Sequence, residues 1–363
     1  MYRIIISLFS SLRLYYLRCV YFFRDRAFIK MYNLPKLSKN EMSIVKQTWP
    51  CLSLKRFDLI YLRMYKKEYG FDPYFICDYQ MQQILKKTNL PIRVFALENK
   101  GMLDIYFDKL PLPEVFVRCI SNVFYNKLMK VISIDEAIDI LKQQEEFIIK
   151  PSIETSQGKG VKKIMVNKDS DKYLLELLSS YKSESGNFIV QEVLYQNAEI
   201  EKLNPSSLNT CRVTTIYING KFDYSSILKV GKKGAIKDNW NCSYLIGMDK
   251  DGTLHGNGYD NKLNKIQTTD NGIKFEGMKV PHFVEMVEFA KEYHIKYFPN
   301  CGVVGWDIFI DRKDKVRIIE INLTNVGVVG EQLCSGTFLK NLGMKFVRYG
   351  MNKVSVGKFN RIS

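Results

Sequence analysis

Three polar residues near the end of the chain have the types and spacing of a divalent-cation site. If the charged run turns at Lys313-Asp314, antiparallel pairing places Asp307 opposite Glu320, and side-chain alternation puts Asn322 on the same face. The other face would then carry Ile308, Ile310, Ile319 and Ile321. Facing carboxylates repel unless a cation lies between them, and Mg²⁺ prefers hard oxygen ligands of this kind. The wet face of an exposed hairpin is the alternative interpretation.

A lysine at the end of an apolar strand is a candidate phosphate ligand. Lys150 closes the run that begins at Phe147, and a Ser- and Gly-containing segment follows from Pro151 to Gly160. A lysine meets a phosphate as a point charge, and backbone N–H groups of such a loop can fold over phosphates. Because the sequence contains no GxxxxGK[ST], a P-loop is excluded. A flexible surface turn is the alternative.

Two further segments carry polar groups where a nucleotide could use them. The apolar run from Phe188 ends in Gln191-Glu192, which could form a hinge that hydrogen-bonds an adenine edge. Arg212 follows Asn209-Thr-Cys and could hold a phosphoryl group through two hydrogen bonds. Taken alone, the first of these segments is more typical of a strand that leaves the core.

In this order, the four segments resemble the ATP-grasp family. The pattern is Lys-Pro with a glycine loop, a Gln-Glu hinge, Asn-Thr-x-Arg, and then GWD…EIN. The stretches 203–212, 238–240 and 304–307 are similar to the sugar-transfer-associated branch, and the resemblance extends from about Leu37 to Phe338. It implies an α+β fold in which two subdomains with antiparallel sheets clasp ATP, preceded by a helical N-terminal region.

The resemblance also implies site roles. Lys150 and Arg212 would be catalytic, Lys150 at the α and β phosphates and Arg212 at the phosphoryl group or acyl phosphate. Mg²⁺, expected as two ions, would be held by Asp307, Glu320 and Asn322. The nucleotide would also contact the hinge, formed by Gln191, Glu192 and Val193. A flexible lid over its phosphates would contain Ser156, Gly158, Lys159 and Gly160. Candidate substrate contacts are Asn209, Lys229, Asp238 and Asn239.

Several positions depart from the family pattern. Arg118 stands where many relatives have a second nucleotide-binding lysine, and arginine changes the geometry of that contact. The lid has Ser-Gln-Gly in place of a glycine run, Asn241-Cys242-Ser243 replaces a glycine pair, and Lys229 stands where arginine is common. No metal ligand is lost, so we expect activity to persist.

The elements that must position these residues follow from periodicity and turn signals. Ser133 is expected to begin a helix, and Asn219-Gly220 to join two strands. We expect strands at 115–119, 146–150, 161–166, 188–194, 212–218 and 221–230, helices at 134–143, 172–181 and 280–294, and a hairpin at 303–323. The predicted division is a basic aromatic segment (1–36), a helical region (37–110), a subdomain with the lid (111–195), a subdomain with the metal site (196–340) and a basic tail (341–363).

Composition bounds the setting of the molecule. The 363 residues are 46% hydrophobic and 25% charged, which is ordinary for a chain that buries a core, but 54 Lys and Arg against 38 Asp and Glu leave a net charge of +16. Residues 1–40 alone carry eight basic side chains and one acid. This excess favours a polyanionic partner, and no nucleic acid is expected because no nucleic-acid-binding motif accompanies it. Eight cysteines without a CxxC pair favour a reducing cytoplasm.

The N-terminal segment leaves two interpretations open. Its longest uncharged run, Ile4 to Leu12, has nine residues, whereas a spanning helix needs about 20. Residues 1–36 could form a basic amphipathic helix on an anionic inner membrane face, or pack on their own domain.

The function implied by the resemblance is an ATP- and Mg²⁺-dependent ligase that joins a small-molecule or sugar carboxylate to an amine. The setting would be capsular or exopolysaccharide biosynthesis, with glycosyltransferase machinery as a candidate partner. Two alternatives are a kinase of a sugar or polyol hydroxyl on the same scaffold, and a non-catalytic nucleotide-binding partner of a membrane glycosyltransferase.

Overall fold

The computed structural model describes residues 26–55, 58–90, 94–107, 109–153, 159–167, 171–235 and 240–337. Two compact units make up the chain, one formed by Met1–Ile84 with Gly327–Ser363 and the other by Leu85–Val326. Within the described residues, no helix combines the length and the apolar character that crossing a bilayer requires. The seven cysteines among them form no disulfide, and Cys19 lies outside the described residues.

The first unit is helical, as the sequence predicts for the region after Leu37. A capping box of Ser38 and Glu41 begins its first helix, and Tyr65 stacks on Phe75 in the core with a centroid distance of 4.4 Å. From the C-terminal helix, the buried Gln332 side chain donates to the Ile76 carbonyl at 2.6 Å. The helices are α2 (Lys39–Thr48), α3 (Asp58–Tyr69), the start of α4 (Asp78–Thr88) and α11 (Val329–Ser335).

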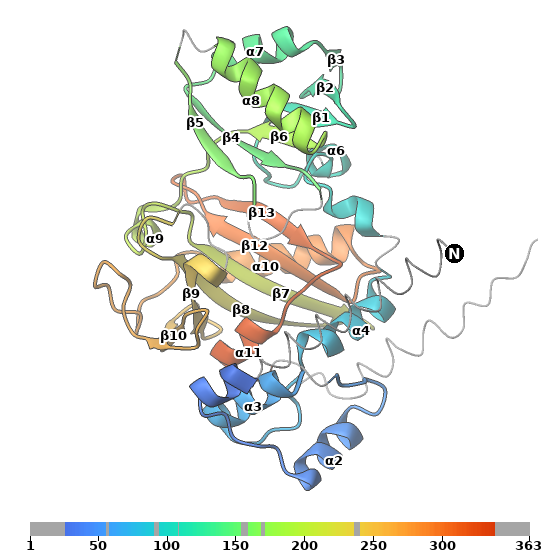
Figure 1. Cartoon of the computed structure of the whole chain (residues 1–363), viewed down its shortest axis with the longest axis vertical. Helices are drawn as coiled ribbons and strands as arrows, with labels where there is room; N and C mark the ends of the chain where they lie inside the picture. The colour runs from blue at the N-terminus through green and yellow to red at the C-terminus, as the bar shows by residue number, and fades with distance from the viewer. Residues whose placement is uncertain are drawn as a thin grey trace, which may run out of the picture. The chain divides into compact units, whose positions relative to one another are not determined.

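The second unit contains a six-stranded antiparallel sheet with helices on one face (Figure 1). Side chains such as Val117, Phe147 and Phe188 pack against the two helices in one core. In sheet order the strands are β3 (Val131–Ile132), β2 (Val123–Asn126), β1 (Val115–Ile120), β6 (Phe188–Gln191), β4 (Glu146–Pro151) and β5 (Lys162–Met165). The helices are α7 (Ile134–Lys142) and α8 (Asp171–Glu184), and the short η1 (Phe95–Glu98) and α6 (Leu103–Tyr106) precede β1.

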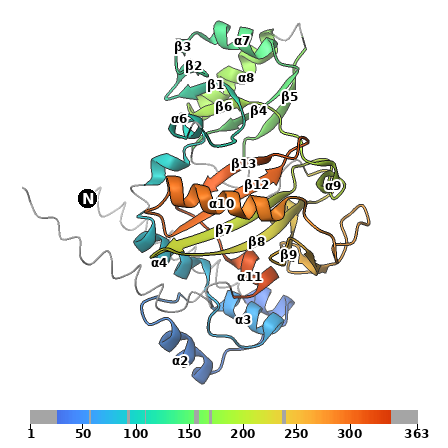
Figure 2. The ribbon, with the colours of Figure 1, turned by 180° about the vertical axis from the view of Figure 1, so that it is seen from behind.

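A seven-stranded antiparallel sheet forms the rest of this unit. Helix α10 (Phe283–Tyr297) covers one of its faces (Figure 2), where Phe298 and Trp306 join the larger core. In sheet order the strands are β11 (Lys265–Ile266), β10 (Leu254–Tyr259), β9 (Ser243–Met248), β8 (Lys221–Gly231), β7 (Thr210–Ile218), β12 (Val303–Ile310) and β13 (Val316–Asn322). The short α9 (Ala198–Glu201) and η2 (Trp240–Cys242) connect them. Two antiparallel sheets with helices confirm the predicted α+β class.

Local signals placed most elements correctly. Ser133 caps α7, and Asn219-Gly220 joins β7 to β8 with both residues in the left-handed region, at φ 55° and 71°. The strand predicted to reach 194 ends at Gln191.

The pairing of β12 with β13 differs from the prediction in one detail. Asp307 does pair with Glu320, but a bulge follows, so that Ile308 pairs with Ile318. Ile318 is therefore the core residue, and the expectation that Ile319 faces the core is wrong, because the extra residue of a bulge shifts every later side chain to the other face.

Candidate functional site

Charged side chains form a row across four neighbouring strands, on the face of the seven-stranded sheet opposite α10. Asp307 pairs in register with Arg212 on one side and Glu320 on the other, and Lys229 follows on β8. The Arg212 guanidinium donates from Nε and Nη2 to the two carboxylate oxygens of Asp307, both at 2.8 Å. Lys229 Nζ lies 2.9 Å from Asp307 Oδ1. The row thus runs from two cations to two carboxylates.

The Asp307 carboxylate is stabilised by its two cations. Only 4% of the residue is exposed. Burial raises the pKa of this carboxyl, but Arg212 and Lys229 outweigh burial and hold the pKa well below its usual range. Asp307 is therefore ionised at any pH at which the protein would work.

A second cationic group approaches the other carboxylate of the row. Lys100, which precedes α6, places Nζ 2.8 Å from Glu320 Oε1. Lys150 lies nearby in β4, and its ammonium group has no hydrogen bond or ion pair with any described residue. Burial and the Lys100 ammonium lower the pKa of Lys150 to about 8, against the opposing effect of Glu320. Two lysines therefore meet at the Glu320 end of the row.

The donor set of this row fits a magnesium ion that arrives with a polyanion. Asp307 and Glu320 pair directly across the strands, and Asn322, opposite Gly305, has a buried amide nitrogen without a partner. Hard oxygen donors of two carboxylates and an amide suit Mg²⁺, which usually keeps several ligands from substrate phosphates. The described residues contain no cluster of three His, Cys, Asp or Glu side chains, so protein carboxylates alone would not complete such a site.

The predicted second cation of the six-stranded sheet is engaged elsewhere. Arg118 and Lys150 both pair with Ile189, from β1 and β4 on either side of β6, and lie on one face of the sheet. The Arg118 side chain is fully buried and donates to both oxygens of Asp104, at 2.9 and 2.6 Å, and to the Gly101 carbonyl at 2.8 Å. A nucleotide contact by Arg118 stays a prediction, whereas Lys100 is the cation that accompanies Lys150.

The hinge after β6 combines an anchored residue with unpaired backbone donors. Gln191 is 5% exposed, and Glu192 N–H donates to the Glu114 carbonyl at 2.9 Å. The Glu192 carboxylate accepts from Glu114 N–H at 2.9 Å and forms an ion pair with Arg317. Among the described residues, no acceptor is found for the N–H of Val193 or that of Leu194. The hinge therefore offers free hydrogen-bond donors next to a fixed residue.

The side chain of Asn209, a predicted substrate contact, is hydrogen-bonded within the protein. It is 1% exposed, and its amide nitrogen donates to the Ile200 and Asn204 carbonyls at 2.9 and 3.1 Å. Its side-chain oxygen accepts from Gly231 N–H at 3.3 Å. These hydrogen bonds position the loop that leads into β7, and a substrate contact by Asn209 stays a prediction.

The remaining predicted residues divide into two groups. Lys159 and Gly160 are exposed, and the Gly160 carbonyl accepts from Tyr181 Oη at 2.7 Å. Four predictions lie outside the described residues: Ser156, Gly158, Asp238 and Asn239.

Sequence reasoning missed several residues that connect the site. Glu98 accepts a hydrogen bond from the N–H of Thr324, just past Asn322, at 2.7 Å. Lys100 pairs with Glu320 through its side chain, and the backbone N–H of Lys100 donates to the Ser152 carbonyl at 3.1 Å. The available signal was the polar Glu98-Asn-Lys-Gly101 run, whose glycine interrupts a helical pattern.

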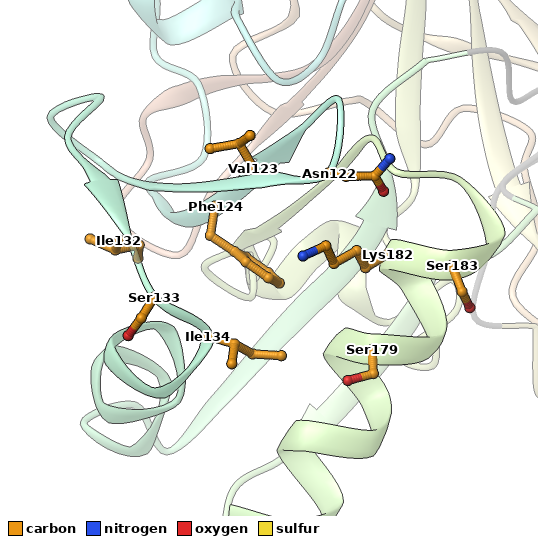
Figure 3. A pocket seen from close by; sticks show the side chains of 9 residues that line it. All are labelled: Asn122, Val123, Phe124, Ile132, Ser133, Ile134, Ser179, Lys182 and Ser183. Carbon is orange, nitrogen blue, oxygen red and sulfur yellow. The ribbon is translucent and has the colours of Figure 1, made fainter.

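A separate pocket lies on the helix side of the six-stranded sheet. Its volume is about 610 Å³, and Lys182 points into it over the Phe124 ring, 5.3 Å from the centroid (Figure 3). Lys150 projects from the opposite face of this sheet, so the pocket is not part of the charged row.

Comparison with known proteins finds distant structural similarities. The structure is similar to D-alanyl-alanine synthetase A from Vibrio cholerae O1 biovar eltor str. N16961, with 12% identity and a TM-score of 0.42, over 70% of this chain and 65% of that chain. It is also similar to the D-alanine-D-alanine ligase from Coxiella burnetii, with 11% identity and a TM-score of 0.39, over 77% and 66% of the two chains. No curated protein matches the sequence.

The family assignment comes from the sequence. Residues 79–347, about three quarters of the chain, match the model of the sugar-transfer associated ATP-grasp family. The match includes both sheets and every predicted site residue. The chain therefore belongs to the sugar-transfer associated ATP-grasp family.

Proposed function

We propose that this protein is an ATP- and Mg²⁺-dependent carboxylate–amine ligase that forms an amide through an acyl phosphate. The observation that carries the proposal is the charged row with Lys229 and Arg212 at one end and Asp307 and Glu320 at the other. Lys150 and Lys100 meet the row at its Glu320 end. A row with cations at both ends and carboxylates between them suits two anionic substrates joined at a metal.

The nucleotide would lie at the Glu320 end. Lys150 and Lys100 would neutralise its phosphates, and the hinge of Gln191, Glu192 and Val193 would meet the adenine edge. The lid residues, which include Lys159 and Gly160, would cover the phosphates. Asp307, Glu320 and Asn322 would hold Mg²⁺, which when bound neutralises phosphate charge and orients the γ-phosphoryl group.

The acceptor carboxylate would lie at the other end of the row. Arg212 and Lys229 both bind Asp307. If Asp307 held Mg²⁺, these two side chains would be available to an anionic substrate. Arg212 can then pair bidentately with a carboxylate or phosphoryl oxygens and hold the reacting groups in line.

The proposed reaction has two steps. A carboxylate oxygen attacks the γ-phosphorus of ATP, the bond to the β-bridging oxygen breaks, and ADP leaves. An amine then attacks the acyl carbon, phosphate departs, and the amine loses a proton. Arg212 would stabilise the negative charge that develops on the phosphoryl oxygens.

The name of the family refers to sugar transfer. We therefore propose a role in capsular or exopolysaccharide biosynthesis, with a sugar carboxylate such as a uronic acid as one substrate. A cytoplasmic location with glycosyltransferase machinery as partner, at the inner membrane face, belongs to the same proposal.

The test is turnover with panels of carboxylates and amines in the presence of ATP and Mg²⁺. We expect ADP release that requires both substrates, and a product whose mass equals acid plus amine minus water. Asp307→Asn and Glu320→Gln should abolish release, while Asp314→Asn, in the exposed turn of the same hairpin, should not. A phosphorylated product would instead indicate a kinase, and ATP binding without turnover a non-catalytic role.

A further inference from the structure

The β12–β13 hairpin that carries the candidate metal ligands also holds the hinge, at its turn end. Asn197 N–H donates to the Ile310 carbonyl at 2.8 Å, and Arg312 N–H donates to the Tyr195 carbonyl at 3.1 Å. The Arg312 guanidinium lies over the Tyr195 ring, 4.3 Å from its centroid. The segment after the hinge therefore runs along the hairpin turn, and one rigid element reaches both the hinge and the charged row.

Arg317 makes the hairpin's contact with the hinge itself. It lies three residues before Glu320 on β13, and its guanidinium forms an ion pair with the Glu192 carboxylate. The same guanidinium donates to the Leu112 carbonyl at 3.3 Å, and Asp311 Oδ2 lies 3.6 Å away. Only 20% of the Arg317 side chain is exposed, so solvent screens this pair less than a surface pair.

This contact fixes the residue that precedes the free backbone donors. Glu192 is held through its N–H and its carboxylate by Glu114, and through its carboxylate by Arg317. The next two N–H groups, of Val193 and Leu194, have no acceptor among the described residues. Both residues are partly buried, and a backbone N–H that is shielded from water needs an acceptor, so these two are suited to a ligand with a hydrogen-bonding edge.

We propose that Arg317 is a positioning residue for the nucleobase. By holding Glu192, it fixes the direction of the N–H groups of Val193 and Leu194, and it links the base to the strand that carries Glu320. This inference rests on the proposed function, because it assumes that ATP binds at the hinge. Since Lys150 and Lys100 face the phosphates, loss of Arg317 should weaken only the contribution of the base.

The experiment compares ATP with inorganic tripolyphosphate, which lacks the base and ribose. Affinities are measured by calorimetry with Mg²⁺ for the full-length protein. We expect Arg317→Ala to lower the affinity for ATP about tenfold, because a charged hydrogen bond is lost. The affinity for tripolyphosphate should be unchanged. Arg317→Lys should recover part of the loss, and Glu192→Gln should reproduce it. Lys279→Ala is the control, because that exposed side chain pairs with Asp251, away from the hinge.

Two results would overturn the inference: unchanged ATP affinity in Arg317→Ala, or equal weakening of ATP and tripolyphosphate. If Arg317→Ala does not fold, Glu192→Gln makes the same comparison with the guanidinium retained. A wild-type protein that binds neither ligand would refute the proposed function and this inference together. Wild-type binding of ATP with no effect of Arg317→Ala or Glu192→Gln would refute the inference alone.

Discussion

Replacing Lys150 with methionine should stabilise the protein while weakening its binding of ATP. Lys150 is 9% exposed and has no anionic partner at hydrogen-bonding distance among the described residues. The pKa of Lys150 is lowered from 10.5 to about 8. At about 1.36 kcal/mol per pKa unit, the charged ammonium therefore destabilises the folded state by about 3 kcal/mol. Methionine has a similar length and carries no charge to desolvate.

The effect of this substitution must depend on pH. The pKa of Lys150 is lower in the folded state than in the unfolded state. The destabilisation by its charge is therefore at its full size below pH 8 and disappears as the pH rises towards about 10.5. Lys150→Met should therefore raise the free energy of unfolding by up to about 3 kcal/mol at pH 7, and by much less at pH 10.

Urea unfolding at the two pH values, followed by circular dichroism, measures this difference. Lys163→Met is the control, because Lys163 on β5 is 44% exposed and already pairs with Glu146 at 2.8 Å. The reasoning is refuted if Lys150→Met is no more stable than wild type at pH 7, or if the gain is the same at both pH values. Calorimetry with ATP and Mg²⁺ should show weaker binding by Lys150→Met.

Three further outcomes are expected. Asp307→Asn should destabilise the fold by about 3 kcal/mol in urea unfolding, because its two partly buried cations lose their counter-charge. Burial lowers the pKa of His294 to about 4. The free energy of unfolding should therefore be highest above pH 6.5 and fall by about 3 kcal/mol as the pH drops to 4. His294→Gln should reduce this pH dependence in acid unfolding. Gly231→Ala should cost about 2 kcal/mol in thermal unfolding, because a Cβ would lie 2.2 Å from a serine hydroxyl.

Each of these outcomes has a control or a contradicting result. A Cβ at Gly256 meets nothing closer than 3.6 Å, so Gly256→Ala should be tolerated, and equal losses at the two glycines would refute the steric argument. An Asp307→Asn variant as stable as wild type would show that the two cations need no counter-charge. An acid dependence unchanged in His294→Gln would assign the titration to another group.

The parts of the fold that could be predicted from sequence are those that depend on local physics. Asn219-Gly220 specifies a hairpin turn because both residues tolerate positive φ, and Ser133 with Glu136 specifies a helix start because each satisfies the other's backbone. Side-chain alternation also placed Asp307 opposite Glu320. The bulge at Ile319 carried no such signal, since a strand with one extra residue has the same composition as a regular strand.

The contacts that complete the candidate site join distant parts of the chain. Lys100 meets Glu320, and Glu192 meets Arg317 across 125 residues. No local sequence pattern predicts such a pairing, because the partners come together only when segments distant in the chain pack against each other. For the same reason, sequence alone could not show that Arg118 pairs with Asp104, and its contact with the nucleotide stays a prediction.

The central claim is that the carboxylate is activated by phosphorylation. Its most direct test is turnover of an ¹⁸O-labelled carboxylate substrate, taken from the panel, with ATP, Mg²⁺ and the matching amine, followed by mass analysis of the released phosphate. An acyl phosphate requires that one labelled oxygen be transferred from the carboxylate to each phosphate, and this is the predicted result. Phosphate released without label, or phosphate retained on the product, would contradict the proposed ligase mechanism.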